Sequence, residues 1–244
     1  MPQKPDVPQS QHPNEPHGAG IAGKLNWLRA GVLGANDGIV SVAAVVVGVA
    51  GATSAITAIL AAGIAALVGG AISMALGEYV SVSSQRDSQR ALIAKERQEL
   101  IDDPEAELAE LAGLYEAKGV SPETAHRVAV ERTEHDALAA HLEVELQITE
   151  NEIVSPWNAA FASALAFVLG AALPMVAILL PPESVRIPIT FAAVLIALAI
   201  TGTIGAKVGG SPALRPTLRV VIGGALALIV TFAIGSLLGT SGII

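Results

Sequence analysis

The chain has 244 residues, of which 52% are hydrophobic and only 15% are charged, and its formal net charge is −8. A soluble domain of this size has about a quarter of its residues charged, so this composition indicates an integral membrane protein. Cysteine is absent, which excludes disulfides and thiolate metal sites.

The N-terminal segment 1–23 contains five prolines and no apolar run. It lacks the apolar core of a signal peptide, so we expect a disordered cytoplasmic tail. Because this short polar tail carries no targeting signal, we expect the plasma membrane of a bacterium rather than an organelle.

Five apolar stretches are long enough to cross the hydrocarbon core of a membrane, which takes roughly 20 helical residues. They predict two spans within 24–84 and three within 153–244, and the fold is therefore expected to be all-α. The first two are joined so closely that they must form a hairpin, and Pro188 is expected to open the fourth. The stretches are approximately 29–52, 55–82, 157–180, 188–209 and 216–238.

Lys and Arg residues in the flanks of the spans predict the orientation. If the N-terminus is cytoplasmic, the inner side receives thirteen of the fourteen basic residues, and the outer side receives Arg186 alone. The opposite orientation would place nearly every positive charge outside. We therefore expect the N-terminus in the cytoplasm and the C-terminus outside.

The segment between the second and third spans, 85–152, is acidic, with 17 Asp and Glu against 7 Lys and Arg. It predicts three cytoplasmic helices, the first of which, 84–101, continues directly from the second span. Asp103 and Pro104 are typical of the start of the next helix, and Gly119 of its end. The third is expected from Ser121 to about residue 149. Apolar residues at helical spacing would pack the three helices together: Leu108, Leu111, Leu114, Val128, Leu138 and Leu142.

Asp37 lies about nine residues into the first span, next to Asn36 and between Gly34 and Gly38. A carboxylate at this depth costs several kcal/mol unless it is paired, hydrated or bound to metal, so it is a candidate functional group. The alternative is a protonated or Asn-paired carboxyl that only stabilises helix packing. The two glycines, four residues apart, are candidates for a close helix contact.

Met74 and Glu78 lie four residues apart near the end of the second span and so share one helix face. The first two spans are antiparallel, and at 1.5 Å per residue Asp37 and Met74 both lie roughly 12 Å from the cytoplasmic side. We expect them to face each other, with Asn36 beside them and Glu78 closer to the cytoplasm. Such a mixture of carboxylate, carboxamide and thioether suits a borderline divalent metal such as Fe²⁺.

The acidic helices carry pairs of metal-ligating side chains at helical spacing, which we interpret as a metal-binding domain. The alternative is a solvated acidic face. A single Glu-x-x-His, Glu123 to His126, is a weak signal for di-iron chemistry, which needs two such elements. The candidate pairs are Glu96 and Glu99, Glu107 and Glu110, and His141 and Glu145.

Two long motifs, GANDGIV at 34–40 and SMALGEYVSVS at 73–83, together with the acidic helices that follow, resemble the vacuolar iron transporter family. The similarity runs from about Leu28 to the end of the fifth span. It implies a homodimeric, five-span, proton-coupled antiporter that exports Fe²⁺, and also Mn²⁺, from the cytoplasm. It also implies a role in iron homeostasis, with no enzymatic activity, no permanently bound cofactor and no nucleic-acid partner.

The resemblance implies that Asp37 and Met74 line the translocation path and that the acidic helices bind the metal. A Met ligand of some family members is replaced here by His141, which bears on the preference among Fe²⁺, Mn²⁺, Co²⁺ and Zn²⁺. Two rival interpretations remain open: a membrane-anchored ferroxidase, and a metal sensor that binds without transport. The implied ligands in the acidic helices are Glu96, Glu99, Glu107, Glu110 and Glu145.

Overall fold

The computed structural model describes residues 21–148 and 155–241, and this part of the chain is entirely α-helical apart from its turns. Most of the expected N-terminal tail and the boundary expected at 152–153 lie outside the described residues. The helices are α1 (Ile21–Ala52), α2 (Ile56–Asp102), α3 (Pro104–Ala117), α4 (Pro122–Val144), α5 (Pro156–Leu179), α6 (Glu183–Val208) and α7 (Leu214–Thr240).

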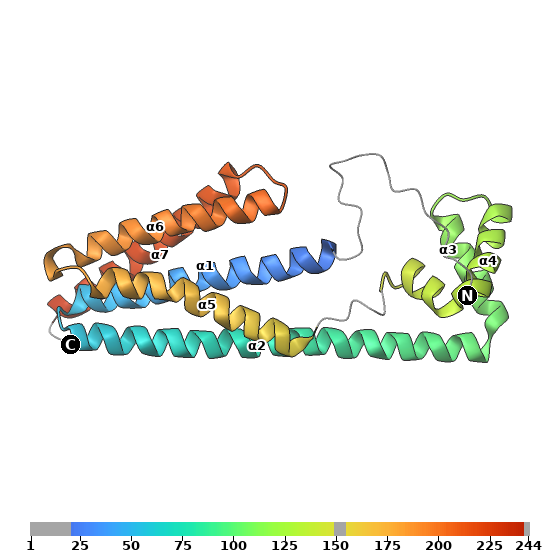
Figure 1. Cartoon of the computed structure of the whole chain (residues 1–244), viewed down its shortest axis with the longest axis horizontal. Coiled ribbons are helices and arrows are strands. Elements are labelled where there is room, and N and C mark those ends of the chain that lie inside the picture. The colour runs from blue at the N-terminus through green and yellow to red at the C-terminus, as the bar shows by residue number, and fades with distance from the viewer. Residues whose placement is uncertain (1–20, 149–154, 242–244) are drawn as a thin grey trace, which may run out of the picture.

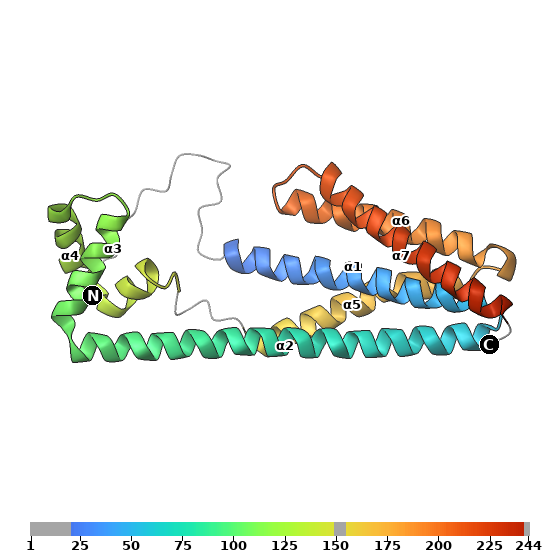
Figure 2. The same cartoon turned by 180° about the vertical axis from the view of Figure 1, so that it is seen from behind.

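Helix α2 has 47 residues and runs along the whole length of the molecule (Figures 1 and 2). At 1.5 Å per residue it is about 70 Å long, more than twice the thickness of a hydrocarbon core. One end packs with α1 and α5, and the other carries α3 and α4. The prediction that the helix of 84–101 continues from the second span is confirmed. The helix can continue because no Gly or Pro lies between Gly77 and Pro104.

Within the described part of the chain, five helices are long and apolar enough to cross a membrane, as predicted: α1, α2, α5, α6 and α7. The predicted start of the fourth span was wrong, because α6 begins at Glu183 and Pro188 lies inside it. Near a helix start, a missing N–H removes a single internal hydrogen bond, so this proline does not end the helix.

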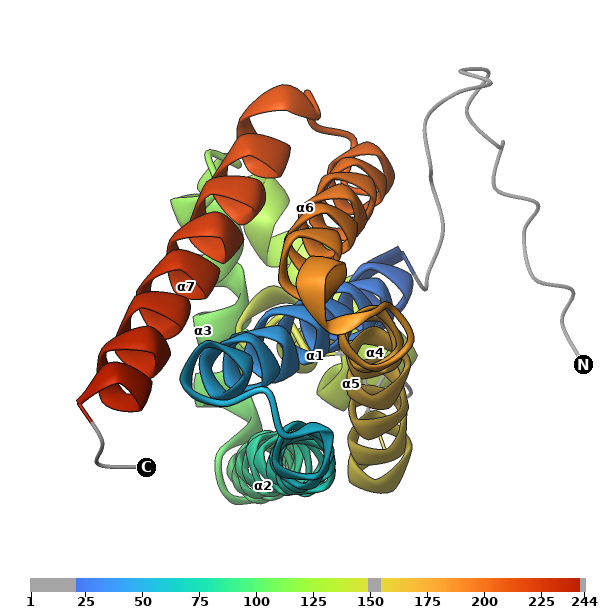
Figure 3. The same cartoon turned by 90° about the vertical axis from the view of Figure 1, so that its left-hand side faces the viewer.

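Helix α1 lies at the centre of the bundle, in contact with all four other spans (Figure 3). Glycines allow this packing, as expected for Gly34 and Gly38. A Cβ at Gly38 would run into the carbonyl oxygen of Phe167 on α5, and one at Gly235 on α7 would run into the carbonyl oxygen of Gly48. Because lipid supplies no hydrophobic drive for pairing, such close backbone contact is a main source of stability here.

The three-helix unit consists of the far end of α2 (85–102), α3 and α4. Asp103 caps α3, since its side chain accepts a hydrogen bond from the Ala106 N–H at 3.1 Å, and Gly119 follows α3 with a φ of +92°. Both predicted features are confirmed. Leu111 is fully buried between α3 and α4, and Leu142 of α4 packs on Ile93 of α2.

Helix α4 differs from the expected unbroken helix to about residue 149. Asp136 has an extended conformation (φ −165°, ψ 94°), so α4 consists of two helical halves. The Asp136 carboxylate accepts a hydrogen bond from the Ala139 N–H at 3.0 Å, as an N-cap does. The helix ends at Val144, and Gln147 has a positive φ of 53°. Helical spacing alone does not reveal the break, because the apolar positions continue across it.

Candidate metal-binding cluster and membrane carboxylate

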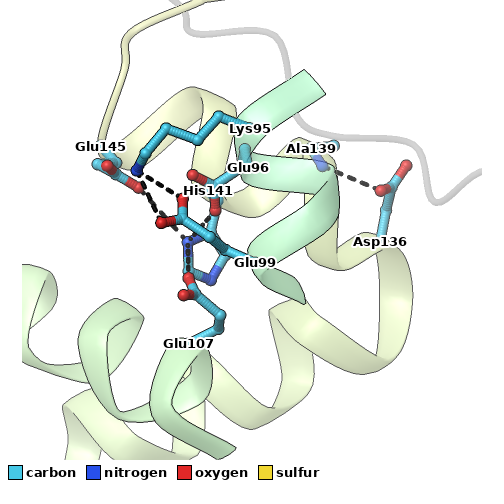
Figure 4. A network of polar contacts seen from close by, with 8 residues as sticks. All are labelled: Lys95, Glu96, Glu99, Glu107, Asp136, Ala139, His141 and Glu145. Atoms are coloured by element: carbon cyan, nitrogen blue, oxygen red, sulfur yellow. Dashed lines mark hydrogen bonds and ion pairs between the residues drawn. The ribbon is translucent and has the colours of Figure 1, made fainter. Parts of the chain in front are cut away.

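Glu96 of α2, Glu107 of α3 and His141 of α4 converge inside the three-helix unit (Figure 4). One ligand atom from each lies within 4.8 Å of the others. All three side chains are buried; the exposed fraction is 3% for Glu96, 9% for Glu107 and zero for His141. Charged groups are almost never fully buried unless they are paired, so this cluster requires a compensating cation or proton.

The His141 ring faces three carboxylates without a hydrogen bond. Its Nδ1 lies 2.9 Å from Glu96 Oε1 and 3.6 Å from both Glu107 Oε2 and Glu145 Oε2. The 2.9 Å contact is short but not aligned as a hydrogen bond, so both ring nitrogens and Glu96 Oε1 are buried without a hydrogen-bond partner among the described residues. Buried polar atoms are nearly always satisfied, so this set of atoms fits a bound cation.

The electrostatics of the cluster favour a cation. Burial, with the charges of Glu145 and Glu107, raises the pKa of Glu96 from its ordinary 4.5 to about 7, against the opposing effect of His141. Burial and the charge of Glu110 likewise raise the pKa of Glu107. A divalent ion at the convergence point would compensate both the burial of these carboxylates and the repulsion between them, the two causes of the raised pKa values.

The other candidate ligands lie around this centre. Glu145 follows His141 by one turn and points toward it. Glu99 is half-buried, and both of its carboxylate oxygens lie 2.7 Å from the Lys95 ammonium. Glu110 is exposed, and its negative charge raises the pKa of Glu107. The structure therefore brings five of the six candidate residues together and leaves Glu110 at the rim.

Asp37 lies on an open face of α1. Its Oδ1 accepts a hydrogen bond from the Ser41 hydroxyl at 2.6 Å, one turn along the helix. Leu33, Ser41 and Val45 on the same face are all exposed, so no described helix of this chain covers this stripe. A carboxylate on such a face would meet lipid, which is costly unless a second chain or water covers it.

Asn36 does not join Asp37 at a common centre. Its Oδ1 accepts a hydrogen bond from the Thr201 hydroxyl, which links α1 to α6. Adjacent residues of a helix point about 100° apart, so the two side chains face different neighbours. The expectation that the Asn36 carboxamide lies beside Asp37 was therefore wrong for a single chain.

Met74 packs against a buried cluster that includes Val42 and Phe167. Val42 is five residues from Asp37 on α1, so it points to nearly the opposite side of the helix. The cluster does not place Met74 against any one residue of α1, so the expectation that Asp37 and Met74 face each other stays a prediction. Glu78 is half-buried and lies one turn beyond Met74 on α2.

Imidazole nitrogen and carboxylate oxygen together suit borderline divalent ions such as Fe²⁺, Mn²⁺, Co²⁺ and Zn²⁺. Five helices of spanning length, with such a cluster on the extension of one of them, define a membrane protein with a candidate metal site. A sequence model of the VIT family matches residues 28–236. The chain therefore belongs to the VIT family, which confirms the resemblance identified from its motifs.

Three relatives illustrate the similarity. The chain is 44% identical over 216 residues to a vacuolar iron transporter of Acanthamoeba castellanii, covering 88% of this chain and 80% of the relative. It is 36% identical to vacuolar iron transporter homolog 1 of Oryza sativa subsp. japonica, covering 96% and 83%. It is also 36% identical to vacuolar iron transporter homolog 1 of Arabidopsis thaliana, covering 89% and 86%.

Four residues of these sites were not predicted from the sequence: Ser41, Lys95, Asp136 and Thr201. Ser41 and Lys95 each lie four residues from a carboxylate that was predicted, so the i, i+4 spacing was an available signal. Thr201 is 165 residues from Asn36, and no local pattern connects the two.

Proposed function

We propose that this protein exports Fe²⁺, and also Mn²⁺, from the cytoplasm by exchange with protons. The observation that carries the proposal is the buried Glu96–Glu107–His141 cluster, which sits on the same continuous helix that crosses the membrane. The names of the relatives, which are vacuolar iron transporters and their homologs, support iron as the cargo.

In this proposal the three-helix unit is cytoplasmic and acts as the intake side. It collects metal from the cytoplasm and passes it along α2 toward Glu78 and Met74. The cytoplasmic location of the three-helix unit is inferred from the distribution of Lys and Arg, because this orientation places thirteen of the fourteen basic residues on the cytoplasmic side. The direction is out of the cytoplasm, whether across a bacterial plasma membrane, as expected from the sequence, or into a vacuole.

Asp37 is the proposed metal-binding group within the membrane, and the path is proposed to form between two copies of the chain. Its open face of α1 supports this, since a second copy would remove the carboxylate and the Ser41 hydroxyl from lipid. It would also bring the Asp37 face of α1 and the Met74 face of α2 into one assembly. The homodimer expected from the resemblance is therefore part of the proposal.

Proton exchange follows from the chemistry of carboxylates. A carboxylate that binds a divalent cation releases its proton, and protonation from the outer side would release the cation. Coupling of this kind needs no cofactor and no bond-forming chemistry.

Reconstitution tests the proposal. Proteoliposomes with wild-type protein should move Fe²⁺ under reducing conditions, whereas Asp37→Asn should abolish the flux. Asp102→Asn is the matched control, because Asp102 is an exposed residue at the far end of α2 that bonds only Gln98 among the described residues. Unchanged flux in Asp37→Asn would refute the assignment, and metal binding without flux in the wild type would favour a sensor.

A further inference from the structure

The second half of α4 behaves structurally as a separate arm. It begins after the break at Asp136 and carries both His141 and Glu145 into the cluster (Figure 4). The first half, by contrast, contributes none of the cluster residues. The position of two candidate ligands therefore depends on the geometry of the break.

Two interactions outside the cluster define this arm, which we take as residues 137–145. The Asp136 carboxylate caps its first turn through the Ala139 N–H. The Arg132 guanidinium pairs with Glu143, which joins the first half of α4 to the arm across the break. The arm also packs on α2, where Leu142 contacts Ile93.

Without metal, docking of the arm is opposed by charge. It brings Glu145 toward Glu96 and Glu107, and it buries a His141 ring whose nitrogens have no hydrogen-bond partner in the part of the chain that the structure describes. Bound metal reverses both effects, because the carboxylates then share a cation and the ring gains a ligand bond. Docking of the arm and metal binding are thus coupled, and the apparent affinity scales with the docked fraction.

We infer that Asp136 and the Arg132–Glu143 pair are positioning residues that determine metal affinity by holding the arm docked, although none of them contacts the metal. This inference rests on the proposed metal capture by the cluster. It assigns a function to the helix break, which places His141 where an unbroken α4 would not.

The first test uses the full-length protein in detergent, titrated with Co²⁺ and followed by its visible absorption, which reports on the ligands and geometry around the ion. Asp136→Ala should weaken Co²⁺ binding about fivefold, the factor for a typical lost N-cap. Asp136→Asn and Asp136→Ser retain an oxygen that can cap the helix, so both should bind as the wild type does. A purely electrostatic role of Asp136 would instead make Asn and Ala equally weak, which would overturn the inference.

The second test uses the ion pair. Arg132→Glu or Glu143→Arg should change the Co²⁺ affinity, and the double swap, which conserves net charge, should restore it to the wild-type value. Ser121→Ala is the control and should leave binding unchanged, because the Ser121 side chain makes no capping bond to the backbone of α4. Failure of the double swap to restore binding would overturn the positioning role of the Arg132–Glu143 pair.

The proposed metal capture and the proposed role of the arm fail in different ways. If the wild-type protein binds no Co²⁺, the proposed metal capture is wrong. If the wild type binds Co²⁺ and Asp136→Ala binds it equally well, the cluster stands and the positioning role of the arm is wrong.

Discussion

Lowering the pH should weaken metal binding by the three-helix unit steeply, with Glu96 as the main cause. The raised pKa of about 7 makes Glu96 a competing proton site, since only the carboxylate binds metal. With this pKa, the deprotonated fraction falls from about 0.9 at pH 8 to about 0.03 at pH 5.5. The apparent dissociation constant should therefore rise about thirtyfold over this range from Glu96 alone.

Isothermal titration of the full-length protein with Mn²⁺ at several pH values provides the assay. Buffers of different ionisation enthalpy should reveal close to one proton released from Glu96 for each metal bound near pH 6. Glu96→Gln should bind more weakly and lose this part of the pH dependence. Glu110→Gln should keep it, because Glu110 is exposed and does not contribute to the shift of Glu96. An affinity in the wild type that is flat from pH 8 to 5.5 would refute the reasoning.

Three further outcomes are expected. The raised pKa of Glu96 adds stability that is fully present below pH 4.5 and is lost as the pH rises through 7. Glu96→Gln should therefore stabilise the metal-free three-helix unit at pH 8 by about 3 kcal/mol, measured by hydrogen exchange of α3. Equal protection in the variant and the wild type would contradict this. Gly38→Leu should abolish folded protein in size-exclusion chromatography, whereas Gly113→Ala, whose Cβ meets open space, should stabilise α3 by about 1 kcal/mol. Asn36→Ala and Thr201→Val should each cost about 1 kcal/mol and be non-additive in thermal unfolding, while additive costs would argue against their hydrogen bond.

Much of the fold follows from local patterns in the sequence. Apolar length predicts the five spans, and the absence of Gly and Pro after Gly77 predicts the long α2. Asp103 and Gly119 mark the two ends of α3, because a capping carboxylate and a residue with positive φ are local requirements. Such features depend on a few neighbouring residues, so they can be predicted without tertiary information.

The features that were not predicted depend on contacts between distant segments. The break at Asp136 conflicts with the helical spacing on either side, and it occurs where His141 has to turn toward α2 and α3. Asn36 lies next to Asp37 in the sequence, but its partner is Thr201 on α6. The number of residues into a span predicts the depth of a side chain in the membrane, whereas the face of α1 that it occupies depends on how the other helices pack around it.

The candidate cluster shows the same division. Pairs at helical spacing identified Glu96, Glu107 and His141 as candidate ligands, but spacing did not distinguish the buried Glu107 from the exposed Glu110. That distinction arises from the angle at which α3 meets α2 after the turn at Asp103. The sequence therefore predicts which side chains are available, and packing decides which of them converge.

Simultaneous measurement of Fe²⁺ and proton movement in proteoliposomes tests the central claim most directly. With a metal-sensitive dye and a pH-sensitive dye enclosed together, wild-type protein should move Fe²⁺ in one direction and protons in the other. An imposed gradient that drives protons in the direction opposite to Fe²⁺ should accelerate the metal flux. Asp37→Asn should remove both signals. Saturable Fe²⁺ binding by the wild type without any movement of metal or protons across the membrane would contradict the account.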